Sequence, residues 1–243
     1  MSFDDQGTRH GRRWGAAVVV LAGAVAAGGV ALYVGKGGDG TAVPVPTATP
    51  RAAAAAPSAA LPSDVPSALP SLLARPVIRP EQAFPEQHVR LEDGSRFERV
   101  DLATTTQCAR GMSQELAAVV QQGAGCVRLT AALFTDVDRR SQITLTVVSF
   151  KRAEDMGLVF GMASTDPVTY QTVSLDPPPS AGLPTVPPGS AGAFRRLATV
   201  RSVVFANGQW GDGAETREAE LTEETEGLLR HVNDTVVAYE KSL

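Results

Sequence analysis

The sequence predicts an α+β domain with the element order β-α-β-β-α-β and an extra C-terminal helix. Two observations predict it. Some segments alternate apolar and polar residues, which is typical of strands, and others place apolar residues three and four positions apart, which is typical of helices. The order is that of a ferredoxin-like split β-α-β plait, in which helices cover one face of an antiparallel sheet. Residues 86–243 are enough for one ordinary domain.

The individual elements follow from local patterns. Residues 142–150 alternate through Ile143, Leu145 and Val147, and the helix 112–122 ends at Gly123. A proline-rich segment, 166–192, follows the second helix, with one further strand expected at 170–175. The predicted strands are 97–103, 126–135, 142–150 and 199–206, the last ending at the turn pair Asn207-Gly208, and the predicted helices are 112–122, 153–163 and 223–240.

An uncharged segment at residues 15–34 predicts one transmembrane helix. Twenty residues span about 30 Å as a helix, which is the thickness of a bilayer core. Arg9, Arg12 and Arg13 precede the segment, whereas Lys36 alone follows it closely. This asymmetry places residues 1–14 in the cytoplasm and the domain outside.

A cleaved signal peptide is the alternative for the same segment. Ala24-Val25-Ala26 resembles a signal-peptidase site, and the basic residues before it also fit a signal peptide. We favour a retained anchor because the apolar run continues beyond Ala26 to Val34. Both interpretations export the domain.

Residues 35–85 predict a disordered spacer between the membrane and the domain. Ten of the 17 prolines lie between Pro44 and Pro85, and the segment has few large apolar residues. Proline fixes φ and removes a hydrogen-bond donor, so the segment has little to offset its ordering entropy.

Charge and motifs exclude several classes of function. The net charge is −4, and an acidic chain repels phosphate backbones, so we expect no nucleic-acid partner. The sequence contains no phosphate-binding glycine loop, no H-E-x-x-H motif and no recognisable Ser-His-Asp arrangement. We therefore expect no catalytic, cofactor-binding or metal-binding residues.

The two cysteines, Cys108 and Cys126, predict a structural disulfide. Both follow the membrane segment, and an even pair of cysteines in an oxidising compartment normally forms a bond. The helix between them rises about 16 Å, yet disulfide-bonded Cα atoms lie within about 7 Å. Residues 104–111 must therefore double back along the helix, with Gly111 as the expected hinge.

One loop is a candidate binding site. Asn207, Trp210 and Asp212 fall in a glycine-containing stretch, where Trp210 could stack on a sugar or a partner. Closure of a core edge by the indole is the alternative interpretation, and the more common one.

The stretch from Cys126 to Asp136, which follows Gln107-Cys108, resembles uncharacterised single-pass membrane proteins of GC-rich bacteria. The resemblance implies a membrane anchor, a spacer and a small exported domain with two cysteines, and it implies no reaction. We expect a non-enzymatic interaction or sensor-like domain with an envelope protein or cell-wall partner. An exported envelope enzyme is the alternative, and the oligomeric state stays open.

Overall fold

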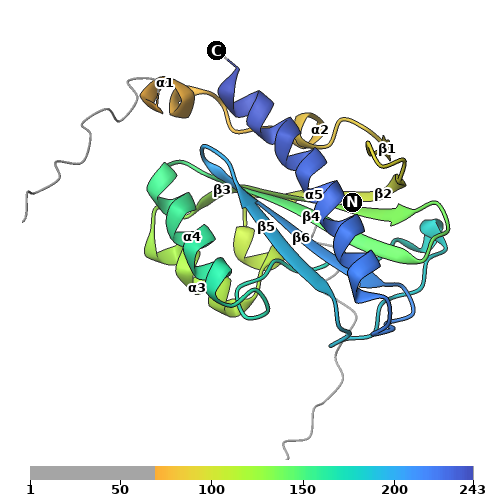
Figure 1. The fold of residues 1–243 in the computed structure, drawn as a ribbon. Helices are drawn as coiled ribbons and strands as arrows, with labels where there is room; N and C mark the ends of the chain where they lie inside the picture. Colours follow the sequence, from red (N-terminus) through yellow and green to blue (C-terminus); the bar gives the residue numbers. More distant parts are fainter. Residues whose placement is uncertain (1–68, 243) are drawn as a thin grey trace, which may run out of the picture. The chain divides into compact units, whose positions relative to one another are not determined.

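The computed structural model describes residues 69–242 and shows a six-stranded antiparallel sheet with helices on both of its faces (Figure 1). The strand order is β1-β2-β3-β4-β6-β5. The strands are β1 (His88–Arg90), β2 (Arg96–Thr105), β3 (Cys126–Asp136), β4 (Ser141–Phe150), β5 (Ala193–Ala198) and β6 (Ser202–Trp210). The α-helices are α1 (Leu69–Ala74), α2 (Pro80–Ala83), α3 (Gln114–Gln122), α4 (Ala153–Thr165) and α5 (Glu218–Lys241), and the 3₁₀-helices are η2 (Cys108–Gly111) and η3 (Pro179–Ala181).

The sheet is covered on both faces, whereas helices on one face were expected. Val148 and Phe150 of β4 pack on the α3 and α4 side, and Ile143 and Leu145 of the same strand pack on the α5 side. Because side chains alternate along a strand, each face supplies its own apolar core. Every residue of β4 is consequently buried.

The connectivity also differs from a ferredoxin-like plait. β2 and β3, which α3 connects, are antiparallel neighbours, although a β-α-β unit joins parallel strands. Only β4 and β5 satisfy that relationship, since both are antiparallel to β6, which lies between them. The disulfide fits this antiparallel pairing, because the end of β2 and the start of β3, which flank its two cysteines, lie at the same end of the sheet.

Most elements agree with the sequence prediction, but the turn at Asn207-Gly208 was wrong. β6 continues through both residues to Trp210. Gly208 is required by close packing and not by a turn, because a Cβ there would lie 2.0 Å from the hydroxyl of Thr225 on α5. The sequence prediction missed β1 and β5, and the strand expected at 170–175 forms one isolated bridge, from Thr172 to Met112.

The folded domain begins before residue 86, where the spacer was expected to end. Ile78 and Phe84 are buried in the core on the α5 side. Arg201, which is 5% exposed, donates hydrogen bonds of 3.1 and 2.9 Å to the carbonyls of Leu73 and Arg75. The last residues before the predicted domain are therefore part of its structure.

The predicted membrane segment, residues 15–34, lies outside the described residues. None of the helices between residues 69 and 242 has the length and apolar character needed to cross a bilayer.

Candidate functional site

A block of neutral polar side chains lies on the α3 and α4 face of the sheet, beyond the apolar core. Gln142 pairs with Gln209 across β4 and β6, and Thr144 pairs with Asn207. Gln142, Thr144 and Asn207 are buried. Further along the same face, β4 and β6 carry Val148, Phe150, Val203 and Phe205 instead. The amides and hydroxyls require a polar covering layer, because buried polar groups need hydrogen-bond partners.

The proline-rich segment 166–192 supplies that layer, and all four side chains bond to its backbone. Proline has no N–H, so the segment offers mainly carbonyl acceptors to the sheet. The four bonds are Asn207 Nδ2 to Thr172 O (2.6 Å), Gln142 Nε2 to Pro184 O (2.7 Å), Gln209 Nε2 to Ser190 O (3.1 Å) and Leu175 N to Thr144 Oγ1 (3.0 Å).

The start of the same segment is hydrogen-bonded to residues 111–113, which follow Cys108 in the chain. Ser113 N donates to Gln171 O and Val173 N donates to Gly111 O, each at 2.9 Å. The backbone N–H and the hydroxyl of Thr169 bond to Asp166 and hold the pKa of that carboxyl below its usual range. The first turn of the segment is therefore closed around an ionised aspartate.

A cleft of about 360 Å³ lies between the polar block and this segment. Apolar side chains such as Leu133 and Val186 line part of it, and hydroxyls and amides line the rest. Asp176 is the one charged side chain that lines the cleft. The hydroxyl of Thr172, a residue that is 1% exposed, is buried there without a hydrogen-bond partner. This volume and this mixture of groups are typical of small-ligand sites.

No protein-family model, curated protein or solved structure matches the chain. The function is therefore inferred from the geometry of the chain itself. Between residues 69 and 242, no three His, Cys, Asp or Glu side chains gather in a way that could hold a metal ion.

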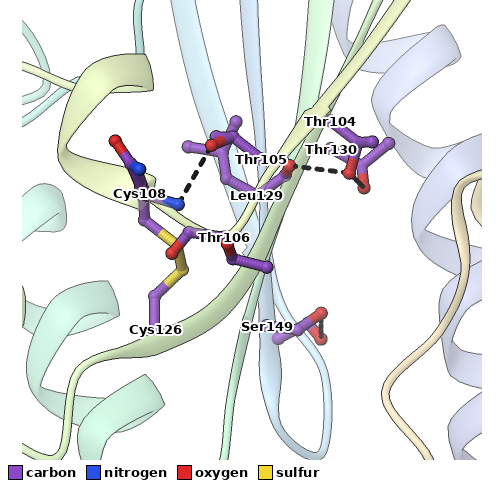
Figure 2. Close-up of a disulfide and its surroundings, with 10 residues drawn as sticks. Thr104, Thr105, Thr106, Cys108, Cys126, Leu129, Thr130 and Ser149 are labelled. Atoms are coloured by element: carbon purple, nitrogen blue, oxygen red, sulfur yellow. Dashed lines mark hydrogen bonds between the residues drawn. A yellow bond between two sulfur atoms is a disulfide. The ribbon is translucent and has the colours of Figure 1, made fainter. Parts of the chain in front are cut away.

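The disulfide joins Cys108 and Cys126, as predicted, with their Cα atoms 6.3 Å apart (Figure 2). Residues 108–111 form η2, which turns the chain from β2 towards α3. Gly111 differs from the expected hinge: a Cβ there would lie 2.9 Å from the Leu129 side chain, and its φ is not positive. The disulfide therefore fixes η2. Gly111 of η2 accepts a hydrogen bond from Val173, which lies in the wall of the cleft.

The predicted binding loop of Asn207, Trp210 and Asp212 is not a loop around an accessible indole. Asn207 and Trp210 belong to β6, and Asp212 accepts a hydrogen bond from Ala214 N in the turn that follows. Trp210 is 1% exposed, and its Nε1 donates to the carbonyl of Thr216 at 2.7 Å. The indole closes the edge of the core, and only Asn207 contributes to the cleft region, through its bond to the proline-rich segment.

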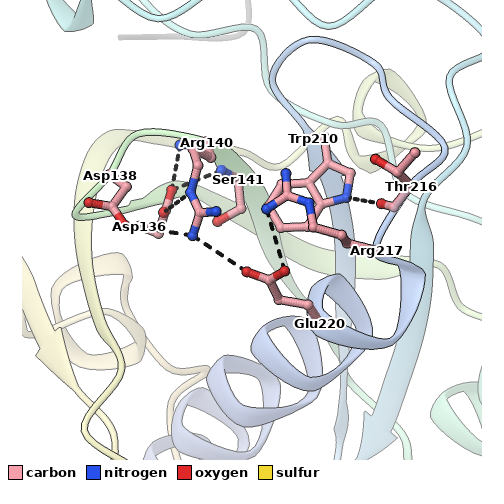
Figure 3. Close-up of polar contacts among 8 residues, drawn as sticks. All are labelled: Asp136, Asp138, Arg140, Ser141, Trp210, Thr216, Arg217 and Glu220. Atoms are coloured by element: carbon pink, nitrogen blue, oxygen red, sulfur yellow. Dashed lines mark hydrogen bonds and ion pairs between the residues drawn. The ribbon is translucent and has the colours of Figure 1, made fainter.

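Charged groups surround the buried indole (Figure 3). The guanidinium of Arg217 lies 4.2 Å from the ring centroid, and that of Arg140 lies 5.9 Å away. Glu220 forms ion pairs of 3.4 Å with both arginines. These contacts hold α5 against the β3–β4 turn, so the cluster has a structural explanation.

Glu224, next to this cluster, has an unusual environment. Burial raises the pKa of its carboxyl above the ordinary value, while the hydroxyl of Ser141 opposes the shift. Asp136 adds to the rise through charge repulsion. Asp136 itself accepts hydrogen bonds from the backbone of Arg140 and Ser141 at 2.6 and 2.8 Å.

A larger open groove of about 610 Å³ lies between residues 90–93 and α5. Its walls carry both signs of charge, including Arg230 and Asp234. No buried polar atom without a partner belongs to the residues that line it. The cleft under the proline-rich segment is therefore the better candidate site.

Neutral residues within strands are the signal that sequence reasoning missed. Gln142 and Thr144 alternate with apolar residues in one strand, and Asn207 and Gln209 do so in another. This spacing of two places each pair on one face. What the sequence does not reveal is that the two strands are neighbours.

Proposed function

We propose that the chain is a membrane-tethered extracytoplasmic interaction domain that recognises a ligand in the cleft between its sheet and residues 166–192. The domain carries no catalytic role in this proposal. The apolar segment 15–34 would provide the tether, and the proline-rich sequence after it would provide reach.

The disulfide is the observation that carries the proposal. Disulfides persist in oxidising compartments and are rare in the cytosol, where thiols are kept reduced. Cys108 is 6% exposed, and its partner Cys126 packs against the same core. A bond in this position supports a structural role outside the cytoplasm, because redox-active disulfides are usually accessible.

The cleft supports the interaction role. Its polar groups face a segment that is attached to the sheet through four hydrogen bonds and through the buried side chain of Leu175. Segments without regular helix or strand structure open at lower free energy than the core does, and binding elements are often drawn from such regions.

Photo-crosslinking in intact cells tests the proposal with a matched pair of positions. A photoreactive amino acid replaces Val173, which lines the cleft and is 48% exposed, or Val137, which lies on the β3–β4 turn and is 56% exposed. The full-length protein is recovered after irradiation, and adducts are located by mass spectrometry of peptides.

The proposal predicts a defined adduct at position 173 and none of the same mass at position 137. A membrane-impermeant biotin reagent, applied to the same intact cells, must also label the domain. Equal adducts at both positions would overturn the role of the cleft, and a domain labelled only after lysis would overturn its placement outside.

A further inference from the structure

The charges of the residues that line the cleft favour a cationic ligand over an anionic one. Asp176 is exposed, lines the cleft, and makes no ion pair or hydrogen bond with any of the described residues. Residues 166–192 contain two aspartates and no lysine, arginine or histidine. No cationic side chain lines the cleft. An anionic ligand would therefore meet an unpaired carboxylate, and a cationic ligand would find in it a partner.

The neutral groups of the cleft add a second requirement. The hydroxyl of Thr172 is buried and unpartnered, although buried hydroxyl groups in folded proteins are normally hydrogen-bonded. Thr172 is among the residues that line the same cavity as Asp176, with its hydroxyl buried behind the cavity surface. A ligand with a hydroxyl or amide group would satisfy Thr172, provided that the group reaches the inner wall of the cleft.

The size of the cavity limits the ligand. A volume of about 360 Å³ is near the lower end of the range for small-molecule sites. It accommodates a group of the size of a monosaccharide or a dipeptide. Leu133, Val186 and Pro187 supply apolar contact for the carbon skeleton of such a group.

We infer that the cleft binds a small organic ammonium group that also carries hydroxyl or amide groups, such as an amino sugar or the N-terminal end of a peptide. Asp176 pairs with the ammonium group, and Thr172 hydrogen-bonds the neutral polar group. This assignment depends on the proposed function of the cleft as the ligand site, and it adds the chemical class of the ligand.

Ligand-observed NMR titrations of the purified full-length protein test the assignment with paired probes. Glucosamine is compared with N-acetylglucosamine and with glucuronic acid, and glycylglycinamide is compared with its N-acetyl form. The two families distinguish an amino sugar from a peptide amine. At least one free amine should bind at least about tenfold more tightly than its acetylated form, and glucuronic acid should not bind.

Two aspartates provide the matched variants. Asp176→Asn should weaken binding of the amine probe about tenfold, whereas Asp234→Asn should leave it within about twofold. Asp234 is exposed and lines the other groove, so this control makes the same charge change at a distant surface. Thr172→Val should weaken the same probe while thermal unfolding shows that the variant is folded.

The outcomes separate this assignment from the proposed function. Equal binding of free and acetylated amines, an anion that competes with them, or equal effects of the two aspartate variants would overturn the ligand class. The same holds if none of the probes binds. The proposed function would survive each of these results if the adduct at Val173 still forms in cells.

Discussion

Asn207 Nδ2 donates a hydrogen bond of 2.6 Å to the carbonyl oxygen of Thr172, and both residues are buried. This bond joins the centre of the sheet to the proline-rich segment. Phe205, two residues earlier on the same face of β6, makes apolar contacts with the core instead. The buried side chain of Leu175 anchors the same segment in the core beside this bond.

Removal of this attachment should loosen the segment before it unfolds the domain. In Asn207→Ala the Thr172 carbonyl loses its partner, which costs about 1–3 kcal/mol for a buried group. Amide hydrogen exchange should accelerate at residues 170–176 more than in β3 and β4. Gln209→Ala, which removes a bond nearer the periphery, should affect residues 188–192 instead. Uniform acceleration across the whole domain in both variants would show that the segment is not separable.

Trp210→Ala should destabilise the domain strongly, because the indole is a fully buried core residue. Truncation of a buried tryptophan costs about 3–5 kcal/mol. Trp210→Phe keeps most of the packing and loses the bond to Thr216, so it should cost distinctly less. Denaturant unfolding of the full-length variants measures both values. If Trp210→Ala unfolded at the same denaturant concentration as the wild type, the indole would not be part of the core.

Asp155 should make the domain sensitive to acid. The Arg152 guanidinium beside it, and Ala124 N–H in the turn before β3, hold the pKa of this carboxyl below its usual value despite burial. The unfolded chain therefore takes up the proton more readily, so acid favours unfolding. The contribution is complete above about pH 3.9, the unfolded value, and is lost as the pH falls through the native pKa. Unfolding free energies measured from pH 7 to pH 2 should fall less steeply in Asp155→Asn.

Glu224 should have the opposite effect. Its carboxyl has a raised pKa in the folded state, chiefly because of burial, so the folded chain holds the proton more tightly than the unfolded chain. Its contribution to stability is present below the unfolded pKa, near 4.3, and is lost as the pH rises through the native value. Glu224→Gln should therefore be more stable than the wild type at pH 7, relative to their difference at pH 4. The raised pKa would be contradicted if the stability of Glu224→Gln, measured relative to the wild type at the same pH, were lower at pH 7 than at pH 4.

Periodicity within single segments was enough to predict several elements. β3, β4, α3 and α4 appear close to their predicted bounds, because each carries its own apolar pattern over nine or more residues. β5 was missed since its sequence contains Arg195 and Arg196 and lies at the sheet edge, where one side needs no apolar partner. A local pattern also cannot show which strands become neighbours, and that is why the plait was wrong.

The site depended on relationships that no local pattern contains. Asn207-Gly208 has the sequence of a tight turn, yet Gly208 serves the close approach of α5 through Thr225. Asn207 itself was chosen for a binding loop and instead bonds to a segment 35 residues earlier in the chain. Trp210 was the most conspicuous residue in the sequence, and its burial removed it from the surface. Cys108 and Cys126 were correctly paired because they were the only two cysteines.

The redox state of Cys108 and Cys126 in living cells decides whether the domain works in an oxidising compartment outside the cytoplasm. Intact cells are quenched with acid, and the full-length protein is denatured and treated with an alkylating reagent of defined mass. We expect no alkylation unless the protein is first reduced, and two alkylated cysteines after reduction. Two alkylated cysteines without reduction would show free thiols in the cell and would contradict a domain that works in an oxidising, extracytoplasmic compartment.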